Sequence, residues 1–147
     1  MSMKERLAEE SKDALKSGQK LRLSTLRLLS AAVKNREVEL LHPLDDEEFV
    51  EVAGQEAKRR RDAIEAYEKA GREDRAATER EELGILQAYL PAALTDQEID
   101  ALIDRAIEET GAAEPGDMGK VMGVVMAGAK GRADGHAVQA RVRARLG

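Results

Sequence analysis

The chain has 147 residues, of which 42% are apolar, 36% are charged and only three are aromatic. Its apolar residues are mainly Ala and Leu, which favour helices over strands, so the composition argues against an all-β sandwich or barrel. Cysteine is absent, which excludes disulfides, thiolate metal sites and a cysteine nucleophile.

The N-terminal 41 residues predict two helices. Ser2 and Glu5 have capping-box spacing, and Gly18 stands where a glycine commonly follows a helix. A second helix is expected from about residue 20 to 41, because a wide leucine stripe runs through this range and Pro43 follows it.

Two further helices are expected before a boundary near residue 92. Asp45 or Asp46 can cap the third helix, which extends to Gly71. The fourth helix is predicted from about residue 74 to 90 and ends at Pro91. The segment that begins at Pro91 then separates two helical parts of the chain.

Three shorter helices are predicted after this boundary. Thr95 and Glu98 form a second capping box, and apolar residues follow with an uninterrupted helical period up to Gly111. Asp117 and Asp134 are expected to cap the last two helices. The predicted fold is therefore all-α, with a four-helix N-terminal domain over residues 1–92 and a three-helix bundle over residues 95–147.

Recognisable catalytic motifs are absent from the sequence. The two histidines, His42 and His136, are far apart and lie beside turns, where a solvated polar role is the more common one. We therefore expect no catalytic residue, no metal site and no cofactor. The charged N-terminus does not resemble a signal peptide, and the longest uncharged apolar run, 121–129, is too short to span a membrane. These features predict a soluble cytoplasmic protein without membrane contact.

Charge is distributed unevenly, although the net charge is only −5. Residues 1–36 carry nine Lys or Arg and four acids, and residues 117–147 carry six Lys or Arg and two acids. Between them, residues 37–56 hold eight acids and no Lys or Arg, and residues 95–116 hold seven acids and one Arg. The chain is therefore polarised, with two basic segments and two acidic ones.

Two basic patterns fall on predicted helices of the N-terminal part. Lys20, Arg27 and Lys34 recur every seventh residue and form one row, which is either a solvated face or a binding face. In the second pattern, a run of four basic residues over 58–61, Glu56 stands one turn before Arg60. This spacing favours ion pairing within the helix over a binding patch.

Gly119 and Gly123 lie four residues apart inside a predicted helix, where each costs about 1 kcal/mol relative to Ala. Two interpretations stay open. The glycines allow tight packing within the three-helix bundle, or they allow an RNA sugar–phosphate chain to approach, with Lys120, Lys130 and Arg132 nearby.

Several segments of the sequence form a recognisable set. They are Leu23-Ser24-Thr25-Leu26-Arg27-Leu28-Leu29, Arg59-Arg60-Arg61-Asp62-Ala63-Ile64, Leu86-Gln87-Ala88-Tyr89-Leu90-Pro91, Asp117-Met118-Gly119-Lys120-Val121-Met122-Gly123 and Gly131-Arg132-Ala133-Asp134-Gly135-His136-Ala137-Val138, followed by Val142 and Leu146. These segments resemble the GatB/YqeY family, and the resemblance covers nearly the whole chain. One departure is His136, where a lysine is usual in this family.

The resemblance implies that the C-terminal part is similar to the tail domain of GatB, the component of the tRNA-dependent amidotransferase whose tail contacts tRNA. It predicts a cytoplasmic module of translation that binds tRNA or another structured RNA in transamidation and has no catalytic centre of its own. Alternatives are an adaptor for an aminoacyl-tRNA synthetase or amidotransferase and, by family association only, a carbon–nitrogen ligase with glutamine as nitrogen donor. The expected RNA-binding residues are Gly119, Lys120, Gly123, Lys130, Arg132, Arg141, Arg145, Lys20, Arg27 and Lys34.

Overall fold

Seven α-helices and no strands make up the computed structural model, which describes residues 1–147. The expected all-α fold is therefore confirmed, and so is the number of helices. A single 3₁₀ turn, η1 (Pro115–Asp117), precedes α6. The helices are α1 (Met3–Lys16), α2 (Lys20–Leu40), α3 (Asp46–Lys69), α4 (Glu73–Gln87), α5 (Asp96–Thr110), α6 (Met118–Ala129) and α7 (Gly135–Leu146).

Most helix ends lie where the capping residues predict them. The Thr95 side chain accepts a hydrogen bond from the backbone N–H of Glu98, and the Glu98 carboxylate accepts one from the backbone N–H of Thr95, which completes the predicted capping box. Asp117 departs from expectation, because its carboxylate does not cap α6. It accepts hydrogen bonds from the backbone N–H groups of Ala113 and Glu114, and therefore stabilises the 3₁₀ turn before α6.

Helix α4 ends at Gln87, three residues earlier than predicted. Tyr89 and Leu90 instead make turn-like hydrogen bonds, from their N–H groups to the carbonyl oxygens of Leu86 and Gln87. The following Pro91 disfavours the α conformation at Leu90, which accounts for the early end of the helix.

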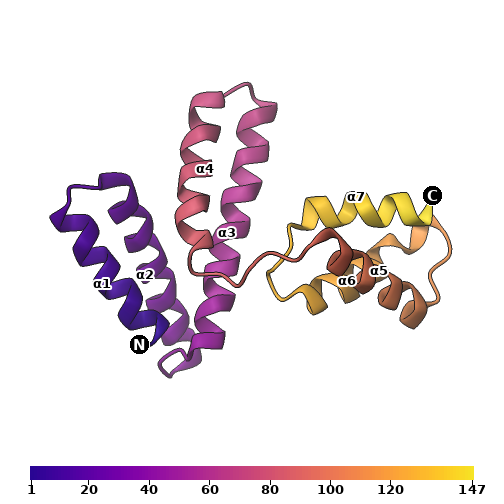
Figure 1. Ribbon diagram of the computed structural model, residues 1–147, viewed down its shortest axis with the longest axis horizontal. Helices are drawn as coiled ribbons and strands as arrows, with labels where there is room; N and C mark the ends of the chain where they lie inside the picture. Colours follow the sequence, from indigo (N-terminus) through magenta and orange to yellow (C-terminus); the bar gives the residue numbers. More distant parts are fainter. The chain divides into compact units, whose positions relative to one another are not determined.

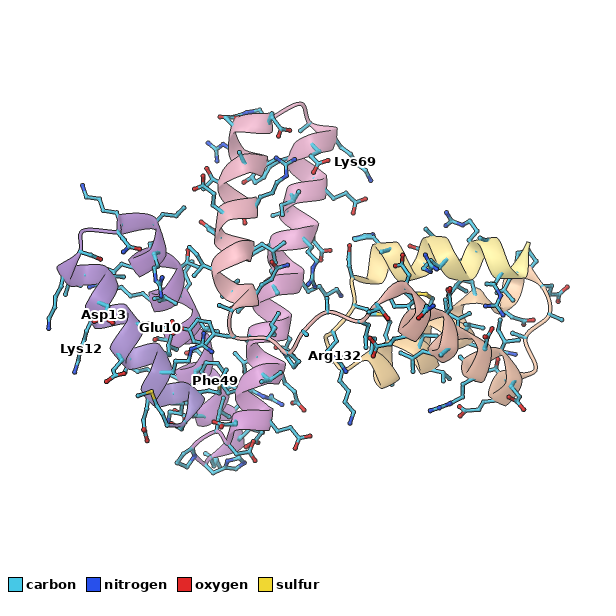
Figure 2. The ribbon with its side chains drawn as sticks, viewed as in Figure 1. Glu10, Lys12, Asp13, Phe49, Lys69 and Arg132 are labelled. Atoms are coloured by element: carbon cyan, nitrogen blue, oxygen red, sulfur yellow. The ribbon has the colours of Figure 1, made fainter.

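The chain divides into two compact units, Met1–Pro91 and Ala92–Gly147. In the first unit, α1 and α2 pair with each other, and α3 and α4 form a long hairpin (Figure 1). A core of aliphatic side chains joins the two pairs around Phe49 and Tyr89, whose ring centroids lie 6.0 Å apart. Phe49, labelled in Figure 2, is fully buried.

The hairpin of α3 and α4 buries charged groups beside small residues. Ala57 and Ala76 are fully buried, and Arg60 places its Nε 3.2 Å from Glu82 and 3.7 Å from Glu79 on α4. Glu56 pairs with Arg59 at 3.7 Å. Ion pairing within the helix is therefore confirmed, but with Arg59 as the partner of Glu56, because Arg60 faces across to α4.

The second unit packs α5, α6 and α7 around their buried apolar side chains. Ile103, Val121 and Val138 come one from each helix and are fully buried in this core. Two hydrogen bonds attach the start of the unit to the loop between α6 and α7: the backbone N–H of Leu94 donates to the Arg132 carbonyl, and Arg132 Nε donates to the Ala92 carbonyl.

None of the seven helices combines the length and the apolar character that a helix needs to cross a lipid bilayer.

Candidate functional site

A cleft in the first unit has a volume of about 640 Å³. The first turn of α2 forms one wall, with Lys20, Leu21 and Arg22, and α4 forms the other, with Gly84 and Ile85 among its lining residues. Its lining is mixed, because apolar side chains alternate with charged ones. The volume falls within the range of about 300–1,000 Å³ that is usual for ligand sites in proteins.

Glu10 of α1, which is labelled in Figure 2, lines this cleft and is the centre of a network of hydrogen bonds. The Glu10 carboxylate accepts hydrogen bonds from the Tyr89 hydroxyl at 2.6 Å, from Arg6 Nε at 2.7 Å and from Arg22 Nη2 at 3.2 Å. The Arg6 guanidinium also lies over the Tyr89 ring, 4.4 Å from its centroid. The two arginines compensate the negative charge of the Glu10 carboxylate, and most of the donors of Arg22 remain available.

Burial alone would raise the pKa of Glu10, but the hydrogen bonds from Tyr89 and Arg6 lower it below its ordinary value. Burial raises the pKa of Tyr89, and its bond to Glu10 raises it further. Glu10 is therefore ionised, with both of its carboxylate oxygens accepting hydrogen bonds, and Tyr89 keeps its proton. Neither group is set up as a general base or a nucleophile, so the arrangement suits binding better than catalysis.

The predicted basic row of α2 lies on its exposed side. Lys20, Arg27 and Lys34 are all exposed and none of them makes an ion pair. Apolar side chains share this side of the helix, with Leu28 48% exposed and Val38 72% exposed. We call the exposed side of α2 the α2 outer face; it comprises Lys20, Ser24, Arg27, Leu28, Ala31, Lys34, Asn35 and Val38.

Two of the predicted RNA-binding arginines hold α7 against α5. Arg141 forms a bidentate pair with Asp100, with N–O distances of 2.9 and 2.7 Å, and Arg145 pairs with Asp104. The pairs join a basic and an acidic segment that are separate in the sequence. Arg132 is likewise engaged, through its bond to the Ala92 carbonyl, and is labelled in Figure 2.

The remaining predicted residues of the second unit lie on the exposed side of α6. Gly119 and Gly123 are exposed, and a Cβ atom at either position would meet no atom within 4 Å. The interpretation that these glycines pack tightly within the bundle is therefore wrong. Gly128 is the crowded position instead, because a Cβ atom there would lie 3.1 Å from Leu102 Cδ2. Lys120 and Lys130 are exposed beside them, and their role in binding stays a prediction.

Sequence reasoning did not identify the cleft. Its central contact joins Glu10 to Tyr89, which are 79 residues apart, and no local pattern links two such positions. Gly84 offered a signal, because a glycine in the middle of a helix is costly and nothing within 4 Å of its Cβ position explains it.

Curated relatives of the chain are fungal proteins named "Altered inheritance of mitochondria protein 41, mitochondrial". The protein from Pyrenophora tritici-repentis is 33% identical over 132 residues, which are 87% of this chain and 71% of the relative. Those from Vanderwaltozyma polyspora and Eremothecium gossypii are each 28% identical over 106 residues, or 70% of this chain. The matches span only 57% and 58% of these two relatives.

These names correct two expectations from the sequence. The relatives are named as mitochondrial proteins, which overturns the expected cytoplasmic location. Their name concerns the inheritance of mitochondria, so the expected function as an RNA-binding module of transamidation, with its adaptor and ligase alternatives, is also wrong. The expected partners themselves, namely tRNA, an aminoacyl-tRNA synthetase or an amidotransferase, stay a prediction.

The family resemblance, in contrast, extends over the whole fold. A family model described as "Yqey-like protein" matches residues 4–146, which include all seven helices but for one residue at the start of α1. The chain therefore belongs to the YqeY-like protein family.

Proposed function

We propose that this chain is a protein-docking module, in which the α2 outer face binds an acidic amphipathic segment of a partner protein. The observation that carries the proposal is the set of three unpaired cations on this face, Lys20, Arg27 and Lys34. Three other basic residues of α1 and α2 differ from them, because Lys4, Arg22 and Arg36 each have a carboxylate partner.

Exposed apolar side chains favour a protein over a nucleic acid as the partner of this face. Leu28 and Val38 lie among the cations and have no partner for their apolar surface. Nucleic-acid backbones are bound mainly by polar and cationic groups, whereas amphipathic helices present an apolar stripe beside a charged one. A partner helix with acidic and apolar residues matches both properties of the α2 outer face.

The names of the relatives add a cellular context to the proposal. They describe mitochondrial proteins and refer to an altered inheritance of mitochondria. We propose that this chain performs a docking step in the inheritance of mitochondria. We also propose that the two compact units are separate domains, and that docking is a property of the first one.

Site-specific photo-crosslinking from Ala31, an exposed residue of the α2 outer face, tests the proposed function. We expect the crosslinked segment of the partner to be acidic and amphipathic. The double variant Arg27→Glu, Lys34→Glu should reduce the crosslinking yield about tenfold, which corresponds to about 1.4 kcal/mol of binding free energy.

The matched control is Lys12→Glu, Lys58→Glu, which makes the same charge change at exposed positions of α1 and α3. This control should retain the parental yield. An equal loss in both double variants would show a non-specific charge effect, and crosslinks to RNA instead of protein would overturn the proposal.

A further inference from the structure

The cleft between the start of α2 and α4 adjoins the α2 outer face, and Lys20 belongs to both. We infer that this cleft receives a bulky apolar side chain of the docked segment, with an adjacent carboxylate of the segment paired to Lys20 and Arg22. The inference rests on the proposed function, because the occupant is the same acidic amphipathic segment. It adds the anchor point, which fixes where along α2 the segment binds.

Leu21 and Ile85 supply apolar surface from opposite walls of the cleft. Both side chains are half-buried, and Ile85 also packs against the core of the first unit, so each leaves only part of its apolar surface to the cleft. Interfaces of this kind gain most of their binding free energy where one large side chain enters a pocket that excludes water. A volume of about 640 Å³ leaves room for an aromatic or leucine side chain and for the backbone that carries it.

Gly84 points to close approach by another chain. It lies inside α4, where glycine is unfavourable by about 1 kcal/mol relative to Ala. Nothing lies within 4 Å of the position of its Cβ atom, so packing within the chain does not require glycine there. A bare backbone in the wall of a cleft allows a partner backbone to come nearer than any side chain would permit.

The charges in the cleft determine the orientation of the segment. Glu10 does not repel a carboxylate, because Arg6, Arg22 and Tyr89 already donate to it. Glu81 on α4 has no cationic partner, so the acidic side of the segment must avoid the α4 wall. Lys20 is free and the Arg22 side chain is 40% exposed, which leaves donors on the α2 wall for a carboxylate.

Selection from a library of random 16-residue helical peptides, displayed against the full chain, tests this inference. We expect enriched peptides to carry a Trp, Phe or Leu with a Glu or Asp one turn away. Their affinity, measured by fluorescence polarisation, should fall at least tenfold in Gly84→Leu, which fills the cleft.

Ala77→Leu is the matched control, since Ala77 is an exposed residue of the same helix that does not line the cleft. This control should bind the peptides like the parent. A charge swap gives a second readout: Lys20→Glu should weaken binding about tenfold, and a peptide with Lys in place of its acidic residue should recover most of the loss. A purely structural effect of Lys20→Glu would not be rescued.

The outcomes separate the inference from the proposed function. If Arg27→Glu, Lys34→Glu weakens peptide binding and Gly84→Leu does not, the cleft is not the anchor site but the proposed function stands. If only Gly84→Leu weakens binding, the α2 outer face is not the docking surface. Failure to enrich acidic amphipathic peptides, or displacement of the peptides by transfer RNA, would overturn both.

Discussion

The Tyr89 hydroxyl donates a 2.6 Å hydrogen bond to the Glu10 carboxylate, and thereby ties the turn after α4 to α1. The two residues lie at opposite ends of the first unit's sequence, so the bond holds α1 and α4 in place together. Because Glu10 also accepts from Arg22 at the start of α2, one carboxylate connects three helices and fixes one end of the cleft.

Removal of this hydroxyl should lower the stability of the first unit. We expect Tyr89→Phe to reduce the free energy of unfolding by about 1.5–3 kcal/mol, the usual contribution of a hydrogen bond to a charged group. Urea unfolding followed by circular dichroism measures the change. Tyr67→Phe serves as the control, because the Tyr67 hydroxyl makes no hydrogen bond within the chain, and an equal loss there would contradict the assigned role of the Tyr89 bond.

The partly buried carboxylates of the α3–α4 hairpin predict a pH-dependent stability. Burial raises the pKa of Glu82 above its ordinary value of 4.5, the neighbouring Glu79 raises it further, and Arg60 only partly offsets this. A group with a raised folded-state pKa contributes stability that is fully present below its unfolded pKa and is lost as the pH rises through the folded pKa.

The Gln side chain in Glu82→Gln is neutral at every pH, whereas the parent loses stability as Glu82 ionises. The stability of the variant relative to the parent should therefore increase as the pH rises from about 4 to 7. Urea midpoints at these two pH values measure the difference. Glu81→Gln changes an exposed neighbour and should show no such increase. The assignment of a raised pKa to Glu82 would be contradicted if Glu82→Gln and the parent differed in stability by the same amount at both pH values.

Local signals in the sequence were sufficient to predict the helices. They were not sufficient to predict the cleft around Glu10 or the ion pairs between helices. Capping pairs such as Thr95 and Glu98 act within one turn, so they predict helix starts correctly. The pairing of Arg141 with Asp100 and of Arg60 with Glu82 depends on which helices meet, and this is a tertiary property. The basic C-terminal segment therefore suggested a binding surface, whereas several of its cations are engaged within the bundle.

The exposed glycines of α6 predict a gain in stability on substitution. Gly119→Ala and Gly123→Ala should each stabilise the second unit by about 0.5–1 kcal/mol, because the added methyl meets no atom and alanine favours the helix. Gly128→Ala should gain less or lose stability, since its Cβ would lie 3.1 Å from Leu102 Cδ2. Thermal unfolding of the three variants distinguishes these results, and destabilisation by the first two would show packing at those positions.

The bidentate pair of Arg141 and Asp100 predicts a structural role for this arginine. Arg141→Ala should lower the urea midpoint of unfolding of the second unit, and added salt should diminish the difference because the pair is partly exposed. Arg143→Ala is the control on the same helix, since Arg143 is exposed and makes no ion pair. Equal effects of the two variants would show that the pair contributes nothing measurable.

The start of the second unit gives a test of domain independence. A fragment of residues 92–147 should unfold cooperatively on its own, because its helices share a closed apolar core. A fragment that begins at residue 95, the boundary predicted from the sequence, lacks both partners of Arg132: the Ala92 carbonyl and the Leu94 N–H. We expect it to be less stable by about 1–3 kcal/mol, since two net hydrogen bonds are lost. Arg132→Ala in the longer fragment should reproduce part of this loss, and a longer fragment without cooperative unfolding would show that the second unit is not a domain.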